Sequence, residues 1–316
     1  MNHPFCLIAP TEGYGKTYAE AIFRSLEKKN KHFTLNNVEV QKFKDGEYKP
    51  RIAANVRKRE CYLIHDPSLA PGNWFTQLAL TNHALHSSSA REIVNVLPYM
   101  RFSRQDRKDE SRTPISARVV ADSIELYADR VITLDLHNPA TQGFYDIPFD
   151  DLQSFPTIIT YLKEHHPTLF TNLAIMSTDV GGAKRAKAFA KRVGIDKVAI
   201  GNKTRPEAGK VKSIQIIGDL EEKVLIIDDL VDSGNTLVKA AQAARAGGAK
   251  EVYGYATHGL FTKGIDTVAQ SFDKLFIGDT LPIPAHPNVE VISFIDLFAE
   301  AIHRTAEGES LSDLFK

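Results

Sequence analysis

Short runs of apolar residues recur along the whole chain, and they predict strands. In the first half the runs cover residues 5–9, 38–43, 61–64, 93–97 and 131–134. In the second half they cover residues 173–176, 197–200, 213–217, 224–227, 252–256, 275–277 and 289–292. Most runs are apolar throughout, as in strands of a parallel sheet whose two faces are both covered. We therefore expect mainly parallel sheets.

Helical spacing appears between these runs. Residues 237–244 carry apolar side chains at i, i+3, i+4 and i+7 and are followed by Gly247 and Gly248, a pair that predicts a helix end. Residues 183–193 form a similar stripe, and residues 295–302 predict a last helix.

The order of strand, loop, helix and strand repeats in both halves, which predicts two doubly wound α/β units. Two prolines and several polar residues interrupt the periodicity at residues 148–156, where we place the boundary.

Composition narrows the class of protein. The chain has 316 residues, enough for two domains, and its 39 basic residues balance 39 acidic ones. No basic surplus is left to neutralise a long nucleic acid, so a small phosphorylated ligand is favoured. Cys6 and Cys61 are too few for a disulfide framework, and no stretch of about 18 apolar residues predicts a membrane span. We expect a cytoplasmic protein.

The segment 224–237 carries the clearest chemistry. A buried strand is expected to present Asp228 and Asp229 at the carboxyl edge of the sheet, where ligands bind in open α/β folds. A turn of small residues then opens a helix, whose backbone N–H groups can bind a phosphate. The turn consists of Asp232, Ser233, Gly234, Asn235 and Thr236. An ordinary capped turn is the alternative, but the whole string favours a sugar phosphate site.

Two further segments leave alternatives open. Strand alternation places Asp135 and His137 on one face, where they could hold a divalent ion or form an ordinary hydrogen-bonded turn. Residues 101–112 hold five basic residues and almost no apolar ones. They predict either a solvated loop or a lid that closes over a triphosphate.

Taken in order, the motifs resemble those of ribose-phosphate pyrophosphokinases. The loop 102–116 is similar to the catalytic loop of that family, and the resemblance covers nearly the whole chain. The other matching segments are 43–47, 135–137, 142–148, 179–185, 203–205, 218–219, 228–236, 257–259 and 308–310.

The resemblance implies two tandem phosphoribosyltransferase-like domains, each a mainly parallel sheet flanked by helices. Residues 1–152 would form an ATP-binding domain, on which a C-terminal helix at 293–316 packs, and residues 153–292 a ribose 5-phosphate-binding domain. It also implies a homodimer or homohexamer with Mg²⁺ as cofactor. The expected reaction transfers the diphosphoryl group of ATP to the anomeric hydroxyl of ribose 5-phosphate.

The resemblance assigns residues to four roles. Lys203 and Arg205 would be catalytic, and Arg205 would also lie near ribose 5-phosphate. The residues expected to bind ATP are Phe43, Asp45, Gly46, Glu47, Arg104, Gln105, Lys108 and Asp109, with Phe43 and Arg104 enclosing adenine. Those expected to bind ribose 5-phosphate are Asp228, Asp229 and the turn 232–236. The expected metal residues are His137, Asp179 and Asp135.

Two rival functions remain. A catalytically silent regulatory homologue would lose or interrupt the catalytic loop, whereas here that loop aligns without a gap. A phosphoribosyltransferase would share the Asp-Asp turn but would not need the ATP motifs of the first half.

Overall fold

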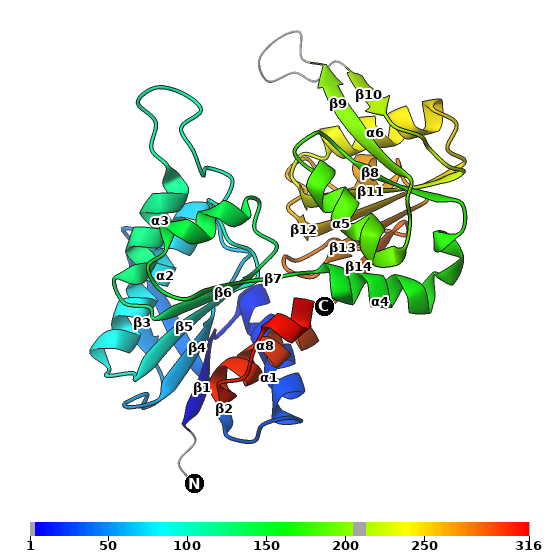
Figure 1. Cartoon of the computed structure of the whole chain (residues 1–316). Coiled ribbons are helices and arrows are strands. Elements are labelled where there is room, and N and C mark those ends of the chain that lie inside the picture. Colours follow the sequence, from blue (N-terminus) through cyan, green and yellow to red (C-terminus); the bar gives the residue numbers. More distant parts are fainter. Residues whose placement is uncertain (1–3, 205–212, 316) are drawn as a thin grey trace. The chain divides into compact units, whose positions relative to one another are not determined.

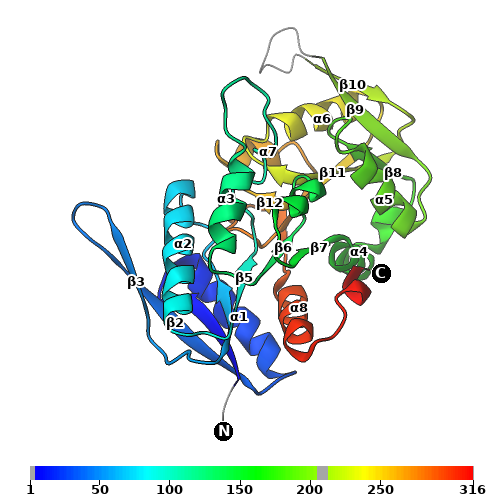
Figure 2. The ribbon, with the colours of Figure 1, turned by 60° about the vertical axis from the view of Figure 1, so that its left-hand side comes forward.

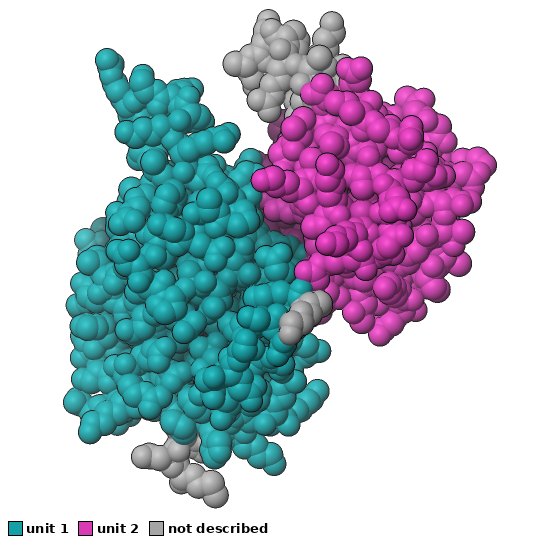
Figure 3. Space-filling view, viewed as in Figure 1, with its two compact units in different colours: residues 1–154, 294–316 teal, residues 155–293 magenta. Residues whose placement is uncertain are grey.

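The chain forms two compact units. The computed structural model describes residues 4–204 and 213–315, with only the backbone at positions 203, 204 and 213. Unit 1 comprises Met1–Ser154 and Phe294–Lys316, and unit 2 comprises Phe155–Ser293 (Figure 3).

Unit 1 contains, in its described part, a seven-stranded sheet with the strand order β3-β2-β1-β4-β5-β6-β7. The strands are β1 (Phe5–Pro10), β2 (Phe33–Lys42), β3 (Tyr48–Ile52), β4 (Glu60–Ile64), β5 (Glu92–Leu97), β6 (Arg130–Leu134) and β7 (Phe149–Leu152). All neighbours are parallel except β2 and β3, which form an antiparallel hairpin at one edge.

Helices cover both faces of this sheet (Figure 1). They are α1 (Gly13–Glu27), α2 (Pro71–Ser87), α3 (Ser116–Glu125) and α8 (Ile295–Glu307), with 3₁₀ turns η1 (Pro139–Phe144) and η3 (Ser312–Phe315). Side chains alternate along β1, so Leu7 packs in the core under α1 and α8, and Cys6 and Ile8 pack in the core under α2 and α3. The sheet is therefore buried on both sides, which explains its continuously apolar strands.

Unit 2 repeats the same plan with the order β10-β9-β8-β11-β12-β13-β14. Its strands are β8 (Leu173–Ser177), β9 (Val198–Thr204), β10 (Ser213–Ile217), β11 (Lys223–Val231), β12 (Glu251–Gly259), β13 (Lys274–Gly278) and β14 (Val289–Ile292). Its helices are α4 (Phe155–His165), α5 (Ala183–Val193), α6 (Asn235–Ala246) and α7 (Asp266–Ala269), with the 3₁₀ turn η2 (Pro167–Phe170). β9 and β10 form the antiparallel edge hairpin. Helices α6 and α7 cover one face, and α4 and α5 cover the other.

The common topology fixes where each unit offers a ligand site. The strand order reverses between β1 and β4 in unit 1 and between β8 and β11 in unit 2. In open α/β sheets ligands bind beyond the carboxyl ends of the strands at such reversals. The segments that follow β8 and β11 are 178–182 and 232–236, and both were singled out in the sequence.

The predicted fold class, two α/β units with mainly parallel sheets, is confirmed. Every apolar run corresponds to a strand, although β2 begins at Phe33, earlier than its predicted start. Two strands were not predicted, β3 and β7, and β7 lies inside the segment proposed as the boundary. Of the helices in the described ranges, none is both long and apolar enough to cross a bilayer.

Candidate active site

The two adjacent carboxylates of unit 2 lie in β11 and point to different partners. Thr178 Oγ1, from the loop after the neighbouring strand β8, donates a 2.8 Å hydrogen bond to Asp228 Oδ2. Asp229 is buried and forms a 2.7 Å ion pair with Arg185 of α5. Of these two carboxylates, only Asp228 is half-buried at the carboxyl edge of the sheet. Burial, and then the negative charge of Asp229, raise the pKa of Asp228 to about 7.

The turn after β11 requires glycine at position 234. Gly234 has φ +76°, in the left-handed region, and a Cβ on it would lie 2.0 Å from Cγ2 of Val268. Asp232 anchors the turn, because its Oδ1 accepts a 2.7 Å bond from Thr262 Oγ1 and its carbonyl accepts a 3.0 Å bond from Thr262 N. The N-cap residue of α6 is Gly234, which has no side chain to cap the helix, so the amides of the first turn suit an anionic group.

Asp179 lies at the same edge of the sheet as this turn. It follows β8, which pairs directly with β11, and its Oδ1 accepts a 3.0 Å bond from Gly182 N. Ser177 Oγ also donates to the Asp179 carbonyl at 2.9 Å, so the loop before α5 is well defined. Unit 2 thus brings together Asp179, Asp228 and the turn 232–236 at the carboxyl edge of one sheet.

Of the two predicted catalytic cations, only Lys203 has a described backbone, and it lies on the edge hairpin of unit 2. The backbone of Lys203 belongs to β9 and pairs with Ile214 of β10. Its side chain and the whole of Arg205 lie outside the described residues.

The Asp135 and His137 pair does not follow the predicted alternation. β6 ends at Leu134, and Asp135 has φ +43°, so the two side chains do not share a strand face. The Asp135 carboxylate is buried and accepts hydrogen bonds from both the backbone N–H and the hydroxyl of Ser154. His137 is exposed. Asp135 therefore holds the end of β6 to the segment after β7, which is a structural role.

The loop between β5 and α3 is anchored at both ends. Phe102 has φ +66°, and its ring packs against Trp74 and Phe75 of α2 with centroid distances of 6.5 and 6.3 Å. Gln105 N donates to the Phe102 carbonyl at 3.0 Å, and Ser116 Oγ at the start of α3 donates to Gln105 Oε1 at 2.5 Å. The predicted ATP residues of this loop are all exposed: Arg104, Gln105, Lys108 and Asp109.

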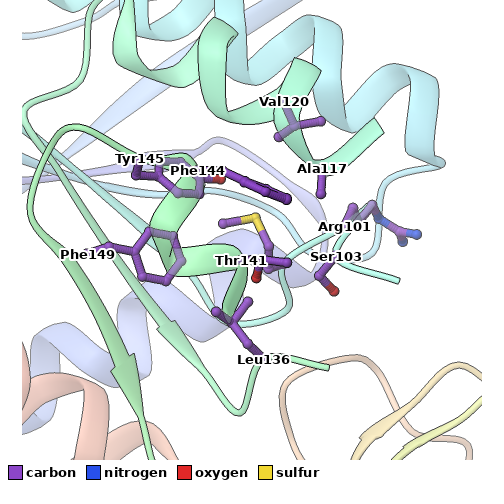
Figure 4. A pocket seen from close by; sticks show the side chains of 10 residues that line it. Arg101, Ser103, Ala117, Val120, Leu136, Thr141, Phe144, Tyr145 and Phe149 are labelled. Carbon is purple, nitrogen blue, oxygen red and sulfur yellow. The ribbon is translucent and has the colours of Figure 1, made fainter. Parts of the chain in front are cut away.

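A small pocket lies behind the base of this loop (Figure 4). It is lined mainly by apolar side chains from the loop base, α3 and the segment around η1, including Met100, Ala117, Val120 and Phe144. The space is about that of one water molecule, far too small for a nucleotide. This pocket therefore cannot be the ATP site.

The remaining predicted ATP residues form the tip of the β2–β3 hairpin. Phe43 N donates to the Glu47 carbonyl at 2.8 Å, Glu47 N donates to Asp45 Oδ1 at 3.1 Å, and Gly46 has φ +98°. The Phe43 ring is 40% exposed. This tip projects from the body of unit 1 and lies away from the loop between β5 and α3 (Figure 2). Within one chain, the tip that carries Phe43 and the loop that carries Arg104 are therefore separate parts of unit 1 (Figure 2).

Two residues of the site had no assigned role in the sequence. Thr178 and Arg185 orient Asp228 and Asp229, yet they precede these partners by 50 and 44 residues. Only the strand pairing of β8 with β11 brings them close. No local pattern indicated these contacts.

The carboxylates of the site suit a Mg²⁺ ion whose coordination shell is completed by phosphate oxygens of the substrate. No group of three His, Cys, Asp or Glu side chains able to hold a metal occurs in residues 4–204 and 213–315. Mg²⁺ is commonly held by one or two carboxylates together with substrate phosphates and water, so a protein cage of three ligands is not required. Asp179, half-buried at the same sheet edge as the turn 232–236, is a carboxylate of this type.

Two repeated α/β units, one of which carries an Asp-Asp strand followed by a phosphate turn, define a protein of the phosphoribosyltransferase-like fold class. Comparisons with known proteins are more specific. Residues 13–127 match the N-terminal domain of ribose phosphate pyrophosphokinase, and residues 204–316 match the phosphoribosyl synthetase-associated domain.

Individual relatives agree with these matches. Ribose-phosphate pyrophosphokinases of Hyphomonas neptunium and Agrobacterium fabrum are each 40% identical to the chain. The first match covers 89% of this chain and 92% of the relative, and the second covers 94% and 96%. The crystal structure of phosphoribosylpyrophosphate synthetase from Mycobacterium smegmatis superposes with a TM-score of 0.86 at 27% identity, over 96% of this chain and 99% of that one. The chain belongs to the ribose-phosphate pyrophosphokinase family.

Proposed function

We propose that the chain transfers the diphosphoryl group of ATP to the anomeric hydroxyl of ribose 5-phosphate, giving 5-phosphoribosyl 1-diphosphate and AMP. The turn 232–236 after β11, called here the phosphate turn, carries this proposal, because Gly234 and the first-turn amides of α6 form an anion site that follows Asp228. Family membership selects this reaction from those that use a sugar phosphate.

The turn and the carboxylates of unit 2 orient the sugar. The amides of the first turn of α6, with the hydroxyls of Ser233 and Thr236, hold the 5-phosphate. Asp228, once ionised, accepts hydrogen bonds from ribose hydroxyls. Asp229 is buried on Arg185, so its role is to fix the strand end and not to contact the sugar.

The reaction forms a bond from the anomeric oxygen to the β-phosphorus and breaks the bond from that phosphorus to the α,β-bridging oxygen. The protein forms no covalent intermediate, so positioning and positive charge supply most of the acceleration. Lys203, Arg205 and Arg104 provide that charge. Mg²⁺ would offset the negative charge of the triphosphate when bound, and Asp179 and His137 are each candidates to hold it together with phosphate oxygens.

The adenine site requires a second copy of the chain. Phe43 with Asp45 and Glu47 at the hairpin tip, and Arg104 with Gln105 in the loop, lie apart in one chain (Figure 2). A homo-oligomer in which the tip of one copy meets the loop of another would complete the site, and a homodimer is the smallest such assembly. We place the enzyme in the cytoplasm.

A direct assay tests the activity. Purified protein is incubated with ATP, Mg²⁺ and ribose 5-phosphate, and AMP and phosphoribosyl diphosphate are measured by chromatography. Equal amounts of both products support the proposal. No product with varied divalent metals and phosphate would favour the silent homologue, and consumption of added phosphoribosyl diphosphate with a nucleobase would favour a phosphoribosyltransferase.

Lys203→Ala tests the role of the β9 cation. We expect turnover to fall by about 10²- to 10³-fold, as is common when one preorganised donor to developing charge is lost. Lys187→Ala, which removes an exposed lysine of α5, serves as the matched control and should leave turnover unchanged. Equal turnover in the Lys203 variant and the control contradicts the assignment.

A further inference from the structure

One hydrogen bond links the nucleotide loop to the segment that carries His137. Asn138 Nδ2 donates to Asp106 Oδ2 at 2.5 Å. Asp106 follows Arg104 by two residues, and Asn138 follows His137 directly. Both linked side chains are partly buried, so water competes less for the bond than it would at an open surface.

Asn138 is held firmly by its own segment. Its Oδ1 accepts a 3.1 Å bond from Ala140 N, which caps η1, and its carbonyl accepts bonds from Thr141 N at 3.0 Å and Thr141 Oγ1 at 2.8 Å. Because the carbonyl end of the amide faces Ala140, the NH₂ end must face the loop. The cap therefore sets the direction in which Asn138 donates.

The loop side is also defined. Gln105, next to Asp106, is held by Ser116 Oγ and by Ala117 N, which donates to the Gln105 carbonyl at 3.1 Å. These bonds fix the loop to α3 but not to the segment after β6. Among the bonds described above, the Asp106 to Asn138 bond alone makes that second connection.

We propose that Asp106 and Asn138 are a positioning pair, which holds the ATP-binding loop in register with the His137 segment so that the nucleotide and its metal are bound together. The pair touches neither substrate. The contribution of this pair to catalysis rests on the proposed function, but its effect on nucleotide binding can be measured independently. A purely local capping role for Asn138 is the competing explanation.

Exchanging the two side chains separates these explanations. Asn138→Asp keeps an oxygen to cap η1 but loses the donor and places a carboxylate against Asp106, so we expect the KM for ATP to rise about tenfold. Asp106→Asn keeps a neutral hydrogen bond, so the KM for ATP should change by about twofold at most. The double variant restores one donor and one acceptor in reversed order, so its KM for ATP should return to within about threefold of wild type.

The controls make every result decisive. The KM for ribose 5-phosphate should stay constant, since that site lies in unit 2. Binding of Mg-ATP without ribose 5-phosphate is measured by calorimetry in parallel, so the test stands even if the protein makes no phosphoribosyl diphosphate. Asp106→Ala, in the loop, gives the same information should Asn138→Asp fail to fold, and weaker ATP binding is expected. A double variant no better than Asn138→Asp, or unchanged ATP binding in Asn138→Asp or Asp106→Ala, overturns the proposal.

Discussion

Ionising the Asp228 carboxylate in the folded protein costs free energy, yet this residue is the one proposed to bind the sugar. A carboxylate beside a buried, negatively charged neighbour resists ionisation, whereas the Thr178 hydroxyl, the backbone N–H of Asp229 and the charge of Arg185 favour the charged form. A sugar whose hydroxyls donate to Asp228 would relieve part of the cost, which links ligand binding to ionisation.

The raised pKa makes stability depend on pH. The pKa of Asp228 is about 7 in the folded protein and near its ordinary value of 3.8 in the unfolded chain. The folded state therefore binds this proton more tightly, and the associated stability is complete below about pH 4 and is lost as pH rises through about 7. We expect the free energy of unfolding, measured with urea, to fall across this range by more in the wild type than in Asp228→Asn. Parallel curves for the two proteins would contradict the assignment.

At the scale of elements, the phosphate turn depends on one backbone conformation. Gly234 begins the turn of α6 with φ +76°, against the side chain of Val268 in α7. Any side chain at this position meets both backbone strain and a clash. The turn is thus defined by a contact between two helices as much as by its own residues.

Gly234→Ala should accordingly destabilise unit 2. Left-handed strain costs about 1–2 kcal/mol, and the Val268 clash adds to it, so we expect a loss of at least about 2 kcal/mol in the free energy of unfolding. The matched control is Gly248→Ala, which has φ +103° but no atom within 4 Å of a new Cβ. If the free energy of unfolding falls by no more than in the control, the Val268 side chain can move aside without an energetic penalty.

The strands that could be predicted from sequence are those with a run of mainly apolar residues, including the partly exposed edge strands β10 and β14. β3 escaped prediction because it is a half-exposed edge strand with Pro50, and β7 because it is a four-residue edge strand with two acidic residues. The phosphate turn was readable because its chemistry is local. The partners of its carboxylates, the left-handed Asp135 and the separation of Phe43 from Arg104 depend on tertiary structure, which local spacing does not encode.

For the whole molecule, the separated hairpin and loop predict complementation between copies. Phe43→Ala and Arg104→Ala should each be nearly inactive alone, because each lacks one wall of the adenine site. If the two walls come from different copies, a mixed dimer contains one intact site. After unfolding and refolding together in equal amounts, we expect about a quarter of wild-type activity, since half the dimers are mixed and half their sites are intact. No recovery would place both walls in one copy.

Unit 2 is an insertion into unit 1, because Phe155–Ser293 separates the two segments of unit 1. The returning α8 packs on α1, where the rings of Phe298 and Tyr18 are 6.1 Å apart and Lys29 pairs with Glu300 at 2.8 Å. A ribosome therefore releases all of unit 2 before it releases the helix that closes unit 1. The domain begun first is therefore closed only when α8 emerges. Until then the apolar face of α1 around Ile22 lacks its partner, which makes nascent chains vulnerable to aggregation.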